Sequence, residues 1–170
     1  MNPAHLHLVL NHLPIVGIPL ATVLLIYAMI TKSKDVLLAA LGATTLVGVL
    51  CIPAFLTGEP AEDVVERRAG VVKAMIEEHE EAAEAGLVAA LVMGSIGAVG
   101  TVWLLKKKSI PSAFLGVTVV SQLVAAGLLA RAGNFGGMIS HPEIREEASP
   151  AASSPGGDYD PEDREGNHDD

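Results

Sequence analysis

The sequence contains little cysteine and few basic residues, and each shortage argues against a class of protein. Cys51 is the only cysteine among 170 residues, which argues against a secreted scaffold held together by disulfides. The 11 basic residues are outnumbered by 20 acidic ones. The chain therefore lacks the basic face with which proteins bind nucleic acid, and no nucleic-acid partner is expected.

The net charge of −9 is mostly a property of the C-terminal tail. Of the 20 acidic and 11 basic residues, 10 and 2 lie in residues 143–170, where the net charge is −8. This leaves 10 acidic and 9 basic residues, a net charge of −1, for residues 1–142. The body of the chain is thus nearly neutral, and it is strongly apolar, because half of all residues are hydrophobic and mean hydropathy is +0.43.

Long stretches of the body carry no charge at all. Four runs of 18 to 22 residues lack Asp, Glu, Lys and Arg: Leu13–Ile30, Val36–Thr57, Ala85–Leu105 and Ser109–Ala130. About 20 apolar residues in a helix cross the ~30 Å hydrocarbon layer of a membrane. An ordinary soluble enzyme is therefore not expected. The pattern predicts an all-α integral membrane four-helix bundle, residues 1–142, with spans at about 10–30, 36–57, 84–105 and 109–131.

The first of these runs is expected to be a span and not a cleaved signal peptide. It has no positively charged segment before it, and Lys32 and Lys34 follow it where a signal peptide has small residues.

The segment between the second and third spans, residues 58–83, has a different composition. Its apolar residues recur at helical spacing and are Val64, Val65, Val71, Val72, Met75 and Ile76. This pattern predicts an amphipathic segment on the membrane surface, with one helix running from Val71 into the third span. Residues 143–170 are rich in Ser, Pro, Gly and acids, which predicts a disordered tail.

Charge also predicts the orientation in the membrane. Five lysines occupy the two short connections at residues 31–35 and 106–108. Lysine-rich connections tend to lie in the cytoplasm. With four spans, both termini and the 58–83 segment are then expected on the non-cytoplasmic side of the membrane.

Five histidines fall on this predicted non-cytoplasmic side. They are His5, His7, His12, His79 and His141. On a helix with 100° per residue, His79 is in line with the small residues Gly86, Ala90 and Gly97, whereas neighbouring acids point the other way. We expect His79 to face the interior of the bundle.

Imidazoles that converge inside a helical bundle suit two kinds of site. One is axial ligation of b-type haem, and the other is a transition-metal site. His12 and His79 are the preferred axial pair, with His141 and His7 in reserve. Glu59, Glu62 or Glu78 would complete a metal site. Glu59 is also a candidate to orient a metal ligand through a hydrogen bond without touching the metal itself. Interfacial histidines without any cofactor are the third alternative.

Three further features bear on a cofactor. Arg131 ends the fourth span on the histidine side, where it is expected to pair with haem propionates or with Glu59, or simply to extend to the interface. The glycines of the third span, Gly94, Gly97 and Gly100, allow either close helix packing or a flat cofactor. Gly133, Gly136 and Gly137 predict a turn that carries His141 back over the bundle.

The run His-Leu-Val-Leu-Asn-His-Leu-Pro-Ile at residues 7–15 resembles the opening of an uncharacterised family of bacterial four-helix membrane proteins, roughly His-Pro-x-Leu-Val-His-Phe-Pro-Ile. Thr57-Gly58, His79 and the glycine-rich residues 133–137 match further features of that family. Leu8 stands where the family has Pro, which leaves both His5 and His7 as candidate ligands. Some members are joined to Rieske iron–sulphur domains, so the resemblance implies a respiratory or redox membrane.

The expected function is electron transfer through b-type haem, with quinone or a redox protein as partner. The alternatives are a membrane protein that binds or senses a transition metal, and a cofactor-free structural or assembly subunit in a homo- or hetero-oligomer. No catalytic motif is found, so the chain is not expected to be an enzyme on its own.

Overall fold

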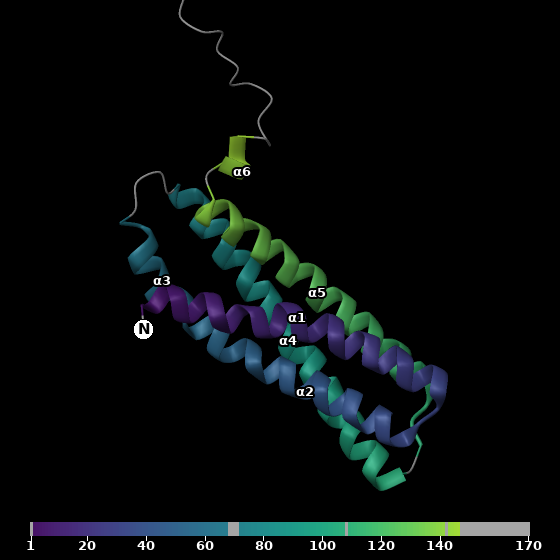
Figure 1. Cartoon of the computed structure of the whole chain (residues 1–170). Coiled ribbons are helices and arrows are strands. Elements are labelled where there is room, and N and C mark those ends of the chain that lie inside the picture. Colours follow the sequence, from purple (N-terminus) through teal and green to yellow (C-terminus); the bar gives the residue numbers. More distant parts are fainter. Residues whose placement is uncertain (1, 68–71, 108, 142, 147–170) are drawn as a thin grey trace, which may run out of the picture.

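The computed structural model describes residues 2–67, 72–107, 109–141 and 143–146, and all the regular structure in these ranges is helical. Six helices follow one another along the chain (Figure 1): α1 (Pro3–Thr31), α2 (Lys34–Leu56), α3 (Gly58–Val65), α4 (Lys73–Lys107), α5 (Ser112–Ser140) and α6 (Glu143–Glu146). Four of them, α1, α2, α4 and α5, are long and apolar enough to cross a membrane. The predicted all-helical fold with four long apolar helices is confirmed.

Local sequence explains where the first two helices begin. Asn2 caps α1, because its Oδ1 accepts a hydrogen bond from the Ala4 N–H at 2.9 Å, and Pro3 occupies the first helical position. Lys32 ends α1 in the left-handed conformation, with φ of 55°, and Ser33 caps α2 through the Val36 N–H. The chain thus reverses direction within a few residues.

The long helices form two hairpins, α1–α2 and α4–α5, which pack on each other (Figure 1). Extensive contacts join α1 to α2, α2 to α4 and α4 to α5, whereas the α1–α5 contact is smaller. Both hairpin turns lie at one end of the bundle, which we call the lysine end because it carries Lys32, Lys34, Lys106 and Lys107. The opposite end, which holds His7 and His79, is the histidine end.

The helices are longer than the predicted spans at the histidine end. The predicted surface segment, 58–83, is divided between α3 and the first turns of α4, and residues 68–71 lie outside the described ranges. One helix, α4, does run on into the third span, beginning at Lys73. In the predicted tail, 143–146 form α6 and the expectation for 147–170 falls outside the described residues.

The turn predicted at Gly133, Gly136 and Gly137 is wrong. Helix α5 continues through all three glycines to Ser140, and the His141 N–H donates to the Gly137 carbonyl at 2.9 Å. Glycine lowers helix propensity in water, but it is common in transmembrane helices. The helix therefore carries His141 onward along its axis and not back over the bundle.

The backbones of α2 and α4 come into contact where glycines of one helix face the other helix. A Cβ atom placed on Gly48 would lie 2.8 Å from the Ala90 carbonyl oxygen and 2.8 Å from the Gly94 Cα. A Cβ on Gly97 would lie 3.0 Å from the Leu41 carbonyl oxygen. The glycine stripe of α4 is therefore filled by α2, so it serves close helix packing and leaves no room for a flat cofactor there.

At the centre of the bundle, a hydrogen bond joins α2 and α5, which lie diagonally opposite each other. Gln122 of α5 and Thr44 of α2 are fully buried, and the Gln122 Nε2 donates to the Thr44 Oγ1 at 2.8 Å. Thr44 in turn donates to the Ala40 carbonyl of its own helix at 2.8 Å. Outside this centre, large apolar side chains such as Leu20, Val23 and Ile30 are 64%, 65% and 73% exposed. An apolar exterior around a partly polar interior is typical of a protein in lipid.

Gly48→Ala should destabilise the bundle, whereas Gly42→Ala should not. The Gly48 substitution places a methyl group against the backbone of α4, and overpacking of this kind costs about 1–3 kcal/mol. A Cβ on Gly42, in the same helix, meets nothing within 4 Å, so alanine is expected to be neutral or stabilising by up to ~1 kcal/mol. Reversible unfolding in mixed micelles with increasing SDS measures the free energy of unfolding of both variants. Equal stabilities for the two variants would contradict the α2–α4 contact.

Candidate functional site

The histidine end brings together two of the predicted site residues, His7 of α1 and His79 of α4. Their ring centroids lie 6.3 Å apart, and the ring planes are nearly perpendicular at 88°. Both side chains are half-buried. The sequence favoured His12 as the partner of His79, whereas the structure places the reserve candidate His7 beside it.

The carbonyl groups of two other helices orient the paired rings. The His7 Nδ1 donates to the Ala54 carbonyl at 3.0 Å, with the Thr57 Oγ1 also 3.2 Å away. The His79 Nδ1 donates to the Ala132 carbonyl at 2.8 Å. A carbonyl oxygen only accepts hydrogen bonds, so both Nδ1 atoms must carry hydrogen. In the neutral form of each ring, Nε2 is then the atom with a free lone pair.

The end of α2 explains why Ala54 accepts the bond from His7. Ala54 lies in the last turn of α2, where carbonyls lose their usual helical N–H partners. Thr57, immediately after the helix, donates its hydroxyl to the carbonyls of Pro53 and Ala54 at 3.0 and 2.9 Å. Because the Thr57 hydrogen is committed to carbonyls, His7 has to be the donor in its own contacts.

A small cavity lies beside the two rings. Its volume is about 60 Å³. All four long helices contribute to its lining, which includes Asn11 and Pro14 of α1, Cys51 of α2, Leu87 of α4 and Leu129 of α5. The lining is mainly apolar, which suits a ligand that is held by very few polar groups.

Asn11 adds a buried acceptor to this cavity. It follows His7 by four residues, so the two side chains share one face of α1. The Asn11 Oδ1 is buried and has no hydrogen-bond partner among the described residues. A buried, unpaired polar atom is costly, and it marks a place where a ligand or water would be stabilised. Asn11 was not predicted, although a polar side chain in an otherwise apolar helix was an available signal.

Gly136 makes room for the ring of His79. A Cβ atom at this position would lie 3.3 Å from the His79 Cε1 and 3.5 Å from its Nδ1. Any larger side chain would press on the ring. The glycine that was predicted to form a turn therefore contributes to the site as part of a helix.

The remaining predicted histidines do not line the cavity. His12 is exposed, and its Nδ1 contacts the Leu8 carbonyl of its own helix. His5 and His141 are exposed as well, His141 directly after the end of α5. The structure therefore does not bring these three histidines to the cavity.

Arg131 forms an exposed ion pair with Glu78, at 3.4 Å, and not with Glu59. It also lies over the ring of Phe135, 5.6 Å from the ring centroid. An exposed pair of this kind contributes little stability. Glu59 and Glu62 both belong to α3, where Glu59 is exposed and Glu62 is half-buried. Within the described ranges, no three His, Cys, Asp or Glu side chains form a group that would hold a metal ion.

Comparison of the chain with family models, with curated proteins and with solved structures gave no match. The family resemblance of residues 7–15 therefore stays a prediction.

The hydrogen bonds predict an unusual tautomer for both paired histidines. In their neutral forms, His7 and His79 should carry hydrogen on Nδ1 and not on Nε2, because the Ala54 and Ala132 carbonyls require a donor. Long-range ¹H–¹⁵N NMR spectra of the ¹⁵N-labelled protein in micelles distinguish the two tautomers. His5, which is exposed, serves as the control and should show an averaged signal. Hydrogen on the Nε2 atoms of His7 and His79 would contradict this geometry.

Proposed function

We propose that the protein is a multi-pass membrane protein that binds b-type haem between His7 and His79 and transfers electrons at the histidine end. The observation that supports this most directly is the pair of imidazoles, 6.3 Å apart, whose Nδ1 atoms are both held by backbone carbonyls. Metal-binding histidines typically have this second hydrogen bond, which fixes the ring and leaves the other nitrogen for the metal.

The distance between the rings suits a shared metal ion. A metal–nitrogen bond of about 2.0–2.1 Å, with ~1.1 Å from the nitrogen to its ring centroid, puts each centroid ~3.2 Å from the ion. Two imidazoles on opposite sides of one ion then have centroids a little over ~6 Å apart. The observed spacing of 6.3 Å agrees with this value.

The number of protein ligands favours haem over a free metal ion. The porphyrin supplies four nitrogen ligands, so two histidines complete the coordination of its iron. A zinc or copper site needs three or four ligands from the protein or solvent. Two imidazoles lie here, and within the described ranges no group of three His, Cys, Asp or Glu side chains could hold a metal ion.

The donor set fits haem, but the cavity in its present form is too small. Ligand pockets of this class hold about 300–1,000 Å³, and the space beside the rings is about 60 Å³. The proposal therefore requires the histidine end to open. The α1–α5 side is the place for this, because these helices make the smallest contact of the four neighbouring pairs.

Haem held by His7 and His79 would supply one-electron transfer. The chain's own part is to hold both imidazoles in the tautomer that presents Nε2 and to surround them with apolar side chains. Quinone or a redox protein in a respiratory-type membrane is the proposed partner. A low-dielectric surrounding of this kind also tunes the potential of an iron site.

A transition-metal ion is the second candidate, and one observation favours it. The cavity of about 60 Å³ accommodates a single ion without any movement of helices, and the buried Oδ1 of Asn11 is an available oxygen ligand beside the two histidines. Imidazole suits zinc, copper, iron and nickel.

His7→Asn and His79→Asn should each abolish haem binding and leave the fold intact. Asparagine places an N–H close to the position of Nδ1, so the bond to Ala54 or Ala132 can persist while the ligand nitrogen is lost. The full chain, purified from haem-replete cells and reduced with dithionite, should show a sharp α-band with about one haem per chain. Each variant should bind at least ~10-fold less haem.

His5→Asn and His12→Asn are the matched controls, because both histidines lie on α1 and are exposed. They should leave the spectrum unchanged. If the wild-type protein has no α-band, the haem proposal is wrong. Metal analysis of the same sample then decides between the second candidate, for which metal is lost in His79→Asn, and a cofactor-free subunit.

We further propose that the lysine end faces the cytoplasm of a bacterial cell and that the histidine end lies outside the inner membrane, because lysine-rich turns are retained on the cytoplasmic side. Cysteine labelling tests this. Asn2→Cys at the histidine end should react with an impermeant maleimide in spheroplasts, whereas Ser109→Cys should react only after lysis. Cys51 is buried, so it provides a silent background. The reverse pattern would mean the opposite orientation.

A further inference from the structure

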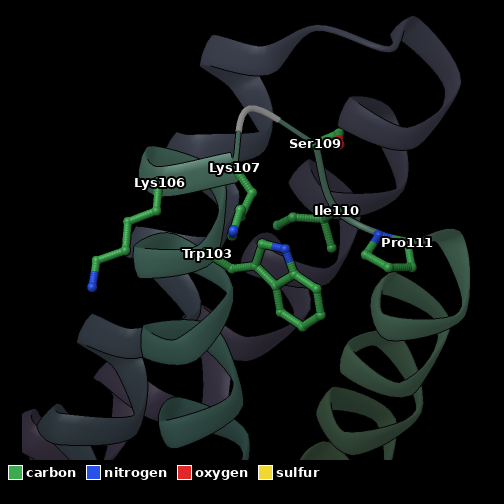
Figure 2. A pocket seen from close by; sticks show the side chains of 6 residues that line it. All are labelled: Trp103, Lys106, Lys107, Ser109, Ile110 and Pro111. Carbon is green, nitrogen blue, oxygen red and sulfur yellow. The ribbon is translucent and has the colours of Figure 1, made fainter.

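A second depression lies at the lysine end, far along the bundle from the histidines. It has a volume of about 670 Å³ and is open to the outside. Six residues line it (Figure 2), three from the end of α4 and three from the linker to α5: Trp103, Lys106, Lys107, Ser109, Ile110 and Pro111. The proposed electron-transfer function makes no use of this depression.

The depression is apolar on one side and positively charged on the other. Trp103 and Ile110 supply the apolar wall, and the indole also packs on Phe114 of α5 with ring centroids 5.6 Å apart. Lys106 and Lys107 supply the charge. In Figure 2, Lys107 lies near Trp103, whereas Lys106 extends outward.

No acidic side chain balances the charge of these lysines within the depression. No carboxylate lines it. The ion pair between Arg131 and Glu78 lies at the other end of the molecule. Asp35, at the start of α2, is the one acid in the described turns of the lysine end. This end therefore keeps an excess of positive charge.

The start of α5 adds to the attraction for an anion. Helix α5 begins directly after Pro111, which lines the depression, and no side chain caps its first turn. The N–H groups of the first turn carry the positive end of the helix dipole. The hydroxyl of Ser109 is a further hydrogen-bond donor at the rim.

We propose that this depression binds the headgroup of an anionic glycerophospholipid. Its phosphate would lie between the Lys107 ammonium group and Ser109, with Lys106 adding positive charge nearby, and an acyl chain would run along Trp103 and Ile110. Tryptophan and lysine at a helix end match the headgroup level of a bilayer, and basic pockets of this kind between spans bind anionic lipids. The inference rests on the proposed insertion into a membrane and is independent of haem.

The chain offers its own probe for this site, because Trp103 is the only tryptophan. The full chain is reconstituted into nanodiscs of phosphatidylcholine that contain a fixed fraction of one brominated lipid, either phosphatidylglycerol or phosphatidylcholine. Bromine quenches tryptophan fluorescence on contact. We expect brominated phosphatidylglycerol to be enriched about fivefold or more beside Trp103 relative to brominated phosphatidylcholine, and the enrichment to fall at high salt.

Lys106→Gln/Lys107→Gln should remove the preference for phosphatidylglycerol. Lys32→Gln/Lys34→Gln is the matched control, since it removes the same charge from the other turn at the same end, and it should keep most of the preference. Far-UV circular dichroism checks that both variants fold. Added inorganic phosphate should not compete. If added phosphate abolished the preference for phosphatidylglycerol, the site would be assigned to phosphate ions and the lipid proposal would be overturned.

The outcomes separate this inference from the proposed function. Equal quenching by the two brominated lipids, or an equal loss of preference in the two double variants, overturns the headgroup site and leaves membrane insertion standing. No quenching by either lipid overturns the insertion itself.

Discussion

The backbone contact between α2 and α4 is the constraint on which the histidine site depends. His7 is bonded to the end of α2, and His79 is bonded to α5, so each imidazole is fixed within one hairpin. The separation of the two rings is then set by how the hairpins pack. They pack most closely where Gly48 meets Gly94, because neither residue has a side chain to hold the helices apart. A change of packing there would alter the distance between two imidazoles that lie near the end of the bundle.

The same constraint determines where the bundle can open. The α2–α4 seam is closed by backbone atoms, and the bond from Gln122 to Thr44 ties the two hairpins at the centre. The α1–α5 seam has neither feature, and its contact is smaller. Because His7 is bonded to α2 and His79 to α5, an opening that keeps both carbonyl bonds has to move one hairpin relative to the other. Such a movement would also change the 6.3 Å separation of the two rings.

The sequence predicts the helices well and the histidine pair only in part. Runs without charge predict the four long helices, because a charged side chain is costly in lipid and rare within a span. The stripe of small residues correctly places His79 towards the interior, since it needs only the helical period of one segment. The choice between His7 and His12 could not be made in this way. It depends on α1 being packed so that His7 meets the last turn of α2, and this register involves residues 47 positions apart. The turn predicted at Gly136 was wrong for another reason. Glycine favours turns in water, but it is tolerated within an apolar helix, so its presence alone does not end α5.

In a membrane, as proposed for this protein, hydrogen bonds between helices have more influence on which helices pack together than they have in a soluble bundle. Lipid tails solvate apolar side chains as well as other side chains do, so burial of Leu and Val does not choose one arrangement of helices over another. Three hydrogen bonds between helices do make such a choice: His7 to Ala54, His79 to Ala132 and Gln122 to Thr44. Two of the three are made by the Nδ1 atoms of the histidines in the proposed site. The bonds that determine how each hairpin closes are therefore the same bonds that fix the hydrogen on Nδ1 and leave the Nε2 lone pairs free in the neutral rings.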